Sequence, residues 1–173
     1  MTRRVALLRG VNVGGAGKLP MAGFRTLLEG LGFARVETLI QSGNAVFDAK
    51  GEATALEAAI RDAIGRHYGF APEVFLRSAS EMAAAATDHR FAGAEGKAVH
   101  VFFLREAPVL DEAALRLAAA PGDAWAVAPG RVTVFLPAGI GRSRLAERLV
   151  RQLPAHTARN LNTVAKLAAM AAD

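Results

Sequence analysis

The chain of 173 residues contains no cysteine. Disulfide bonds, thiolate metal sites and a cysteine nucleophile are therefore excluded. Aromatic residues make up only 6% of the chain, and the four histidines lack the spacing of a metal site. No apolar run approaches the roughly 20 residues that a membrane-spanning helix needs, and the N-terminal segment carries no secretory signal. We therefore expect a cytoplasmic protein with no membrane anchor, no metal and no cofactor.

Positive charge is concentrated towards both ends of the chain. Residues 1–35 hold six basic residues against Glu29, and residues 131–166 hold seven against Glu147. Residues 36–130 hold eight basic and thirteen acidic residues. If the two basic regions meet in the fold, they form a surface that favours anionic partners. If they do not meet, the arginines are a solvated surface without a partner.

The first half of the chain shows the hydrophobic spacing of strand, helix, strand, strand, helix, strand, which is the order of a ferredoxin-like unit. Strands are expected at 5–9, 36–41, 44–48 and 73–77, and helices at about 21–31 and 56–69. A two-residue turn at Ser42-Gly43 would join the second and third strands.

The same order recurs after a helix predicted at 80–87, for which Ser78 and Glu81 form a capping box, and a linker over 88–96. Strands are then expected at 97–104, 124–127, 131–136 and 155–158, and helices at 111–120, 142–153 and about 162–171. Asp111 is the predicted N-cap of the first of these helices. The pattern predicts an α+β protein with two tandem ferredoxin-like subdomains plus a C-terminal helix, divided as 1–87 and 97–173.

A glycine-rich loop, RGVNVGG, follows the first predicted strand. Right-handed crossover places Arg9–Lys18 and Gln41–Asn44 at one sheet edge, beside the start of the first helix. Helix N-termini attract anions, and bare glycine backbone lets an anion approach closely. The predicted ligand-binding residues at this edge are Arg9, Gly10, Asn12, Gly14, Gly15, Lys18, Gln41, Ser42 and Asn44. The alternative is that both loops are tight turns, with Asn12 bonding to its own backbone.

Common nucleotide and catalytic motifs do not fit this region. A P-loop needs glycine and Ser/Thr where this chain has Asn12 and Leu19. The dinucleotide pattern G-x-G-x-x-G fails because Pro20 stands at its last glycine. The two candidate loops contain no Asp, Glu, His or Cys, so the sequence identifies no catalytic residue.

Four segments in combination, LLRGVNVGG, GKLPMAGFRTLLEGLGF, VETLIQSGNAVF and TARNLNTVAKL, resemble one bacterial family, domain of unknown function 1697. The resemblance implies two ferredoxin-like subdomains and no established reaction. It adds matching positions beyond the nine binding residues named above, namely Met21, Thr38, Gly43, Arg159, Asn160, Thr163 and Lys166. We include the last four among the predicted binding residues, because their segment reads as a second helix entry capped by Asn160 or Asn162. Leu161 departs from the family, which commonly has tryptophan there.

Three hypotheses for function follow. The first is a protein that binds an anionic, phosphate-bearing ligand, either a nucleotide or a nucleic acid. The second is an enzyme acting on a small phosphorylated or acyl substrate, with the loops stabilising charge. The third is a protein-interaction module whose loops are purely structural. No aromatic residue lies in the candidate loops, which counts against a platform for base stacking.

Overall fold

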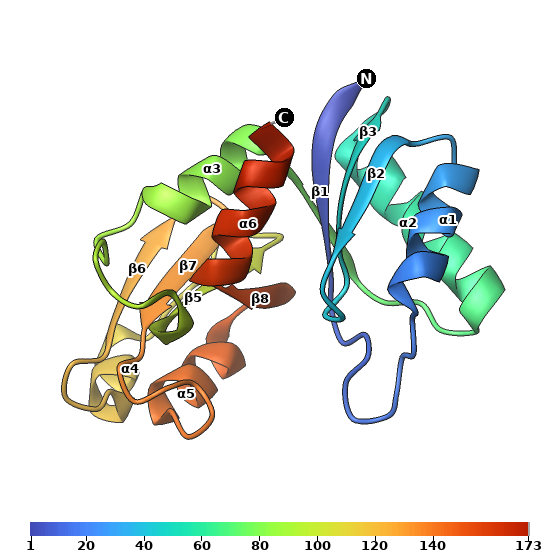
Figure 1. Cartoon of the computed structure of the whole chain (residues 1–173). Helices are drawn as coiled ribbons and strands as arrows, with labels where there is room; N and C mark the ends of the chain where they lie inside the picture. Colours follow the sequence, from blue (N-terminus) through green and yellow to red (C-terminus); the bar gives the residue numbers. More distant parts are fainter. Residues whose placement is uncertain (173) are drawn as a thin grey trace. The chain divides into compact units, whose positions relative to one another are not determined.

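The computed structural model describes residues 1–172 of the chain (Figure 1). Its contacts divide these residues into two compact units. The first unit contains residues 1–83 together with residues 167–172, and the second contains residues 84–166. The sequence had assigned the whole C-terminal helix to the second subdomain, whereas the contacts divide that helix between the two units.

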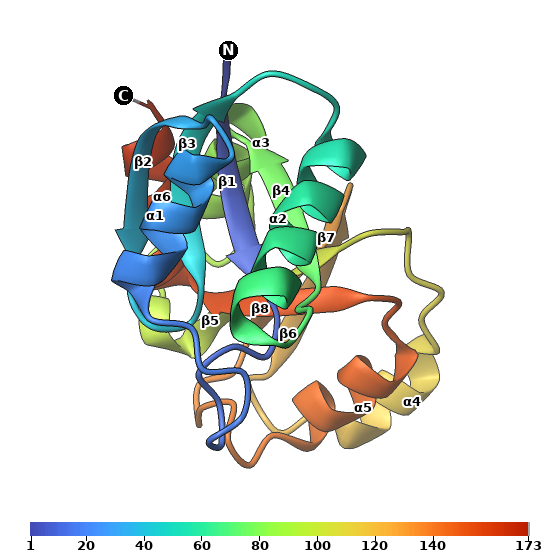
Figure 2. The same cartoon turned by 90° about the vertical axis from the view of Figure 1, so that its right-hand side faces the viewer.

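The first unit is built on a four-stranded sheet of β1 (Thr2–Leu8), β2 (Ala34–Leu39), β3 (Asn44–Ala49) and β4 (Val74–Ser78). The strand order is β2-β3-β1-β4, and each neighbouring pair is antiparallel. Two helices, α1 (Met21–Gly30) and α2 (Ala53–Tyr68), cover one face of this sheet (Figure 2). This arrangement confirms the first predicted ferredoxin-like subdomain.

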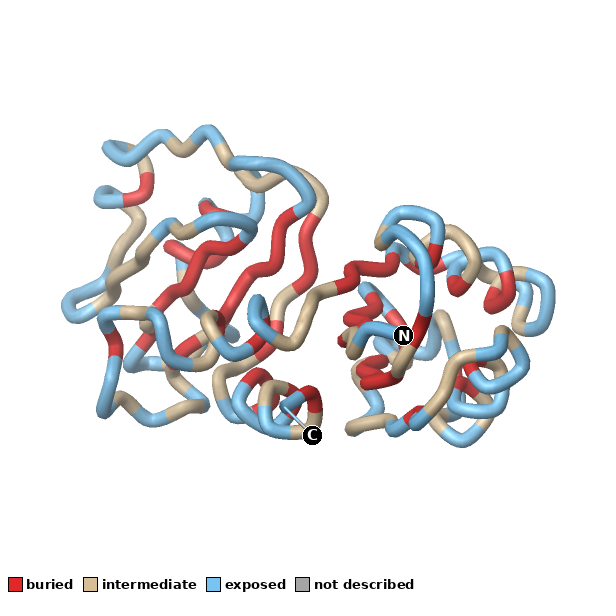
Figure 3. The backbone as a smooth tube through the Cα atoms, turned by 90° about the horizontal axis from the view of Figure 1, so that it is seen from above, coloured by how far each residue is buried: buried red, intermediate tan, exposed pale blue. Residues whose placement is uncertain are grey.

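The core of the first unit forms where the apolar face of the sheet, with a period of two residues, meets the apolar faces of the helices, with a period of 3.6. Alternate residues of β1, Ala6 and Leu8, lie in one buried cluster with Phe24 of α1 and Ile60 of α2. Side chains alternate between the two faces of a strand, so these β1 residues point towards the helices. The central strands β1 and β3 are buried along most of their length, and Figure 3 shows buried backbone, in red, inside each unit.

The connection between β2 and β3 differs from the predicted two-residue turn. Leu39 pairs with Asn44, so the loop contains the four residues 40–43. Ile40 takes a positive φ of 48°, which is uncommon for a β-branched side chain. The strand therefore ends two residues earlier than its apolar run suggests, because Ile40 has already left the extended conformation.

Arg3 connects the sheet edge of the first unit to the C-terminal segment. Its guanidinium donates to the carbonyl oxygen of Arg35 at 2.8 Å and to Glu37 Oε1 at 2.8 Å. It also donates to the carbonyl oxygen of Met170 at 3.2 Å. The pairing of β2 with β3 shifts register beside Arg35, where φ is 47°.

The second unit repeats the same topology. Its sheet contains β5 (Val99–Leu104), β6 (Ala124–Ala128), β7 (Arg131–Phe135) and β8 (His156–Asn160), in the order β6-β7-β5-β8. Its helices are α4 (Glu112–Ala118) and α5 (Arg144–Gln152), which contribute Leu115, Leu145 and Leu149 to a core with alternate residues of β5 and β7. The second predicted ferredoxin-like subdomain is thus confirmed.

Capping residues define most of the remaining helix starts. Ser78 and Glu81 exchange the two hydrogen bonds of the predicted capping box at α3 (Ala79–Thr87), and Asp111 caps α4 as expected. Ser143 caps α5, so this helix starts two residues later than predicted. The predicted linker ends in a short 3₁₀ turn, η1 (Gly96–Ala98), and the chain continues after β8 as α6 (Leu161–Ala172). Within residues 1–172, no helix is both long enough and apolar enough to cross a membrane.

Candidate functional site

The loop between β1 and α1 extends beyond the ends of the strands and turns back on itself (Figure 1). The N–H of Asn12 donates to the carbonyl oxygen of Gly17 at 2.9 Å, and the N–H of Ala16 donates to that of Val13 at 3.1 Å. Gly14 and Gly15 form the tip with positive φ, and a Cβ atom on either would meet no other atom within 4 Å. The tip therefore leaves its backbone open to an approaching group.

The second loop lies against the first, as crossover handedness predicts. Leu8 N–H donates to the carbonyl oxygen of Gly43 at 2.8 Å. A Cβ atom on Gly43 would lie 2.5 Å from Cγ2 of Val11 and 2.9 Å from Cβ of Leu8. Only glycine permits this close approach, so the expected meeting of the two loops at one sheet edge is confirmed.

Asn12 holds the two loops together. Its Nδ2 donates to the carbonyl oxygen of Leu19 at 2.8 Å and to that of Gln41 at 2.7 Å. Its Oδ1 accepts from the N–H of Leu19 at 2.8 Å. Both amide hydrogens and one lone pair of the oxygen are thereby used. The side chain predicted to contact a ligand thus has a structural task across both loops.

The other polar side chains of the hairpin divide into buried and exposed groups. Asn44 is fully buried, and its Nδ2 donates to the carbonyl oxygen of Leu39 at 3.0 Å and to Ser42 Oγ at 2.9 Å. These bonds stabilise the four-residue loop from within. Gln41 is exposed, so its side-chain amide remains accessible at the surface.

A hollow of about 680 Å³ opens between the two loops and the start of α1. It is lined by Asn12, Gly15, Ala16, Lys18, Leu19, Pro20, Met21, Ala22 and Gln41. The N-cap residue of α1 is Pro20, which makes no side-chain capping bond. The first N–H groups of a helix have no partner within the helix, so those of Met21 and Ala22 are left for solvent or a ligand. Lys18 is exposed beside them.

Arg9 forms an ion pair with Glu73, a partner that was not predicted from the sequence. Its Nη1 lies 3.4 Å from Glu73 Oε1, with both side chains close to half exposed. The backbone is also paired, since Arg9 N–H donates to the carbonyl oxygen of Glu73 at 3.0 Å. The signal was present in the topology, because β4 starts beside the end of β1 in a ferredoxin-like sheet. An exposed pair of this kind contributes little stability, so the charge of Arg9 stays available.

The four candidates from the C-terminal motif belong to the second unit. Arg159 is buried in β8, where its Nη1 donates to Thr157 Oγ1 and to the carbonyl oxygen of Ala158, each at 2.8 Å. Burial lowers the pKa of Arg159 to about 10. Asn160 Oδ1 accepts from the N–H of Thr163 at 3.0 Å and so caps α6, as one of the two predicted caps. Of this group, only Lys166 is exposed.

The described part of the chain contains no candidate metal site. No three His, Asp or Glu side chains among residues 1–172 come together in a way that could hold an ion. The described lining of the hollow contains one lysine and no carboxylate, so its charge favours an anion over a cation.

Comparisons with known proteins agree with this architecture. A family described as protein of unknown function (DUF1697) matches residues 1–133, which include both loops but not the C-terminal motif. Among solved structures, the conserved bacterial protein SP0830 from Streptococcus pneumoniae is similar, with 25% identity and a TM-score of 0.76. The similarity covers 98% of each chain. No curated protein matches the sequence.

Proposed function

We propose a function from the site itself, since the chain belongs to the DUF1697 family, whose members are described only as proteins of unknown function. The hollow between the glycine-rich loop and α1 binds an anionic, phosphate-bearing ligand. That ligand is a nucleotide or the phosphate of a nucleic-acid strand. The observation that carries the proposal is the uncapped start of α1, which opens into a hollow beside Lys18.

The electrostatics of this corner favour an anion. A helix N-terminus carries a partial positive charge of roughly half a unit, and its free N–H groups can donate to phosphate oxygens. Lys18 adds a full charge, and Arg9 adds another that is only weakly paired. No carboxylate is among the described residues that line the hollow.

The site residues divide into two roles under this proposal. Lys18, Gln41 and the backbone around Gly15 contact the ligand. Asn12 and Asn44 position those groups by fixing the two loops, and they make no contact of their own. This division predicts that the ligand is held mainly by backbone and one lysine, as in other anion sites at helix starts.

The proposal is tested by titrating ¹⁵N-labelled protein with inorganic phosphate, pyrophosphate, a nucleoside triphosphate and a short oligonucleotide. We expect the amide signals of Gly15, Met21 and Ala22 to shift with at least one of these probes. Lys18→Ala should weaken that binding about tenfold, the usual value of a charge-assisted hydrogen bond. The probe that binds most tightly distinguishes a nucleotide from a strand.

The matched control is Lys50→Ala. Lys50 is also exposed, but it follows β3 at the opposite end of the same sheet. It should leave binding unchanged while removing the same charge. If both lysine variants weaken binding equally, the effect is only one of net charge and the proposed site is wrong. The proposal also fails if none of the four probes shifts the loop signals.

A further inference from the structure

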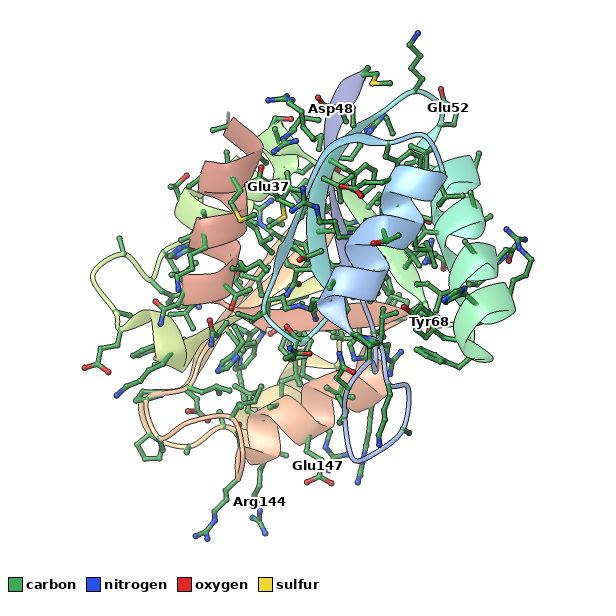
Figure 4. The ribbon with its side chains drawn as sticks, turned by 45° about the vertical axis from the view of Figure 1, so that its right-hand side comes forward. Glu37, Asp48, Glu52, Tyr68, Arg144 and Glu147 are labelled. Atoms are coloured by element: carbon green, nitrogen blue, oxygen red, sulfur yellow. The ribbon has the colours of Figure 1, made fainter. Side chains whose placement is uncertain are left out.

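The outward face of α5 in the second unit carries a row of charged side chains. Arg144, Glu147, Arg148 and Arg151 follow the spacing i, i+3, i+4, i+7, which places them on one side of a helix. The buried residues Leu145, Ala146 and Leu149 take the other side. Figure 4 shows Arg144 and Glu147 extending from α5 into the surrounding space.

This row borders a groove between α4 and α5. Two hollows of about 400 and 330 Å³ share Leu117, Ala118 and Arg144 among their lining residues, so they adjoin. Ala114 and Ala118 of α4 form a floor of small side chains. Arg142 lines the hollow that extends beyond the start of α5. The groove is thus bordered by four arginines.

The carboxylates at the groove do not balance these cations. Glu147 pairs with Arg151 in the same turn of helix. Asp123 lines one hollow, and its Oδ2 already accepts from the N–H of Ala120 at 2.9 Å. Within residues 1–172, the side chains of Arg142, Arg144 and Arg148 make no hydrogen bond or ion pair with another residue.

The placement of these arginines works against the stability of α5. Arg142 and Arg144 lie at the helix N-terminus, where the helix dipole disfavours positive charge. Arg144 and Arg148 are an i, i+4 pair of like charge, which is also unfavourable. Neither position supplies packing to the core, since both side chains are exposed. Helix stability therefore does not explain this row of arginines, whereas binding to an anionic partner does.

We propose that this groove docks the phosphate backbone of a nucleic-acid strand. The arginines from Arg144 to Arg151 rise by roughly 10 Å along the helix axis, which is more than one phosphate group can occupy. A guanidinium presents a planar fork of donors that matches phosphate oxygens. No aromatic side chain is among the described residues that line either hollow. The groove therefore contacts the backbone rather than stacking bases, and binding has little sequence preference.

The experiment measures binding of a labelled single-stranded oligonucleotide of mixed sequence by fluorescence anisotropy, at several salt concentrations. All variants carry Lys18→Ala, so that the proposed anion site on the first unit does not contribute. The groove variant is Arg144→Gln with Arg148→Gln. It should weaken binding roughly tenfold or more, because each arginine makes a charge-assisted contact. The slope of log Kd against log salt concentration should fall by about 1.4, since each single-strand phosphate contact contributes roughly 0.7.

The control is Arg66→Gln with Arg116→Gln, which removes the same charge from exposed positions outside the groove. Arg116 is on α4, but its helical angle points it well away from Ala114 and Ala118. A second variant, Arg144→Lys with Arg148→Lys, should keep the salt slope and still weaken binding, because lysine keeps the charge and loses the fork.

Three results would overturn the proposal. The first is equal binding by the groove and control variants, and the second is a parent Lys18→Ala protein that binds no oligonucleotide at low salt. The third is competition by an acidic peptide as effective as that by an oligonucleotide of equal charge, which would identify a protein partner. Every substituted side chain is exposed, so no variant should melt appreciably below the parent protein, and the groove variant should be slightly more stable because it removes the like-charge pair. Loss of binding is thereby separated from loss of folding.

Discussion

Replacing Asn12 with alanine tests whether the glycine-rich loop is held by its own side chains. The substitution removes three hydrogen bonds, two to the backbone of Leu19 and one to Gln41. Leu19 is fully buried, so its N–H and carbonyl lose partners in a region with little water. Each lost bond costs about 0.5–1.5 kcal/mol. Alanine also tolerates the φ of 55° at this position less well than asparagine does, by about 1 kcal/mol.

The expected loss for Asn12→Ala is therefore about 4 kcal/mol, which corresponds to a fall in Tm of about 8–16 °C for a chain of this size. Gln41→Ala is the matched control, because this side chain is exposed at the same edge. Its effect should stay within about 0.5 kcal/mol. Asn12→Gly separates the two causes, since glycine removes the bonds but accepts the positive φ. Thermal and urea denaturation measure all three variants without knowledge of a ligand.

The reasoning is refuted if Asn12→Ala is as stable as the parent protein, or if Gln41→Ala loses more stability than Asn12→Ala. The first result would return Asn12 to the role of a ligand-binding group, and the second would show that the Gln41 side chain supports the loops instead. A stability loss that Asn12→Gly fully restores would mean that backbone conformation, and not hydrogen bonding, explains the choice of asparagine.

Two further predictions concern packing and pH. Gly43→Ala should lower the free energy of unfolding by about 2–5 kcal/mol, because the new Cβ would clash with Val11 and the φ of Gly43 is positive. Urea titration measures this loss. Stability close to that of the parent would contradict the close approach of the loops. Burial lowers the pKa of His100 from its ordinary 6.5. As the pH falls, His100 is therefore protonated at a higher pH in the unfolded chain than in the folded protein. The stability that His100 contributes is therefore present above about pH 6.5 and is lost as the pH falls through the lowered folded pKa. His100→Gln should flatten this part of the Tm profile against pH, and an unchanged profile would show that His100 is not responsible.

The sequence was sufficient for the topology because hydrophobic period and crossover handedness are local or nearly universal rules. The order of elements in each half, the capping box at Ser78 and the meeting of the two loops all followed from them. The two-residue turn at Ser42-Gly43 was wrong because the conformation of Ile40 overrides the preference of an apolar residue for a strand. Such an exception depends on register with β3, which composition does not encode.

The candidate site was predictable in position but less so in the role of each residue. The glycine-rich loop and the start of α1 were expected at one sheet edge, and the structure places them there. The partner of Asn12 is a carbonyl 29 positions away, and a bond of that range depends on the completed fold. Arg159 is a similar case, because its burial in β8 results from sheet pairing and leaves no mark in the sequence. The sequence therefore predicted where these polar residues lie better than it predicted whether each one binds a ligand or stabilises the fold.

The division of the chain at residue 167 has a consequence for the order in which the protein is made. The first unit takes residues from both ends of the sequence, and Arg3 near the start donates to the carbonyl of Met170. Domains generally fold from the N-terminus as the ribosome releases them. Here the sheet of the first unit can form early, but its Arg3 hydrogen bond waits until the rest of the chain has been translated. Translation thus completes the second unit before it completes the first.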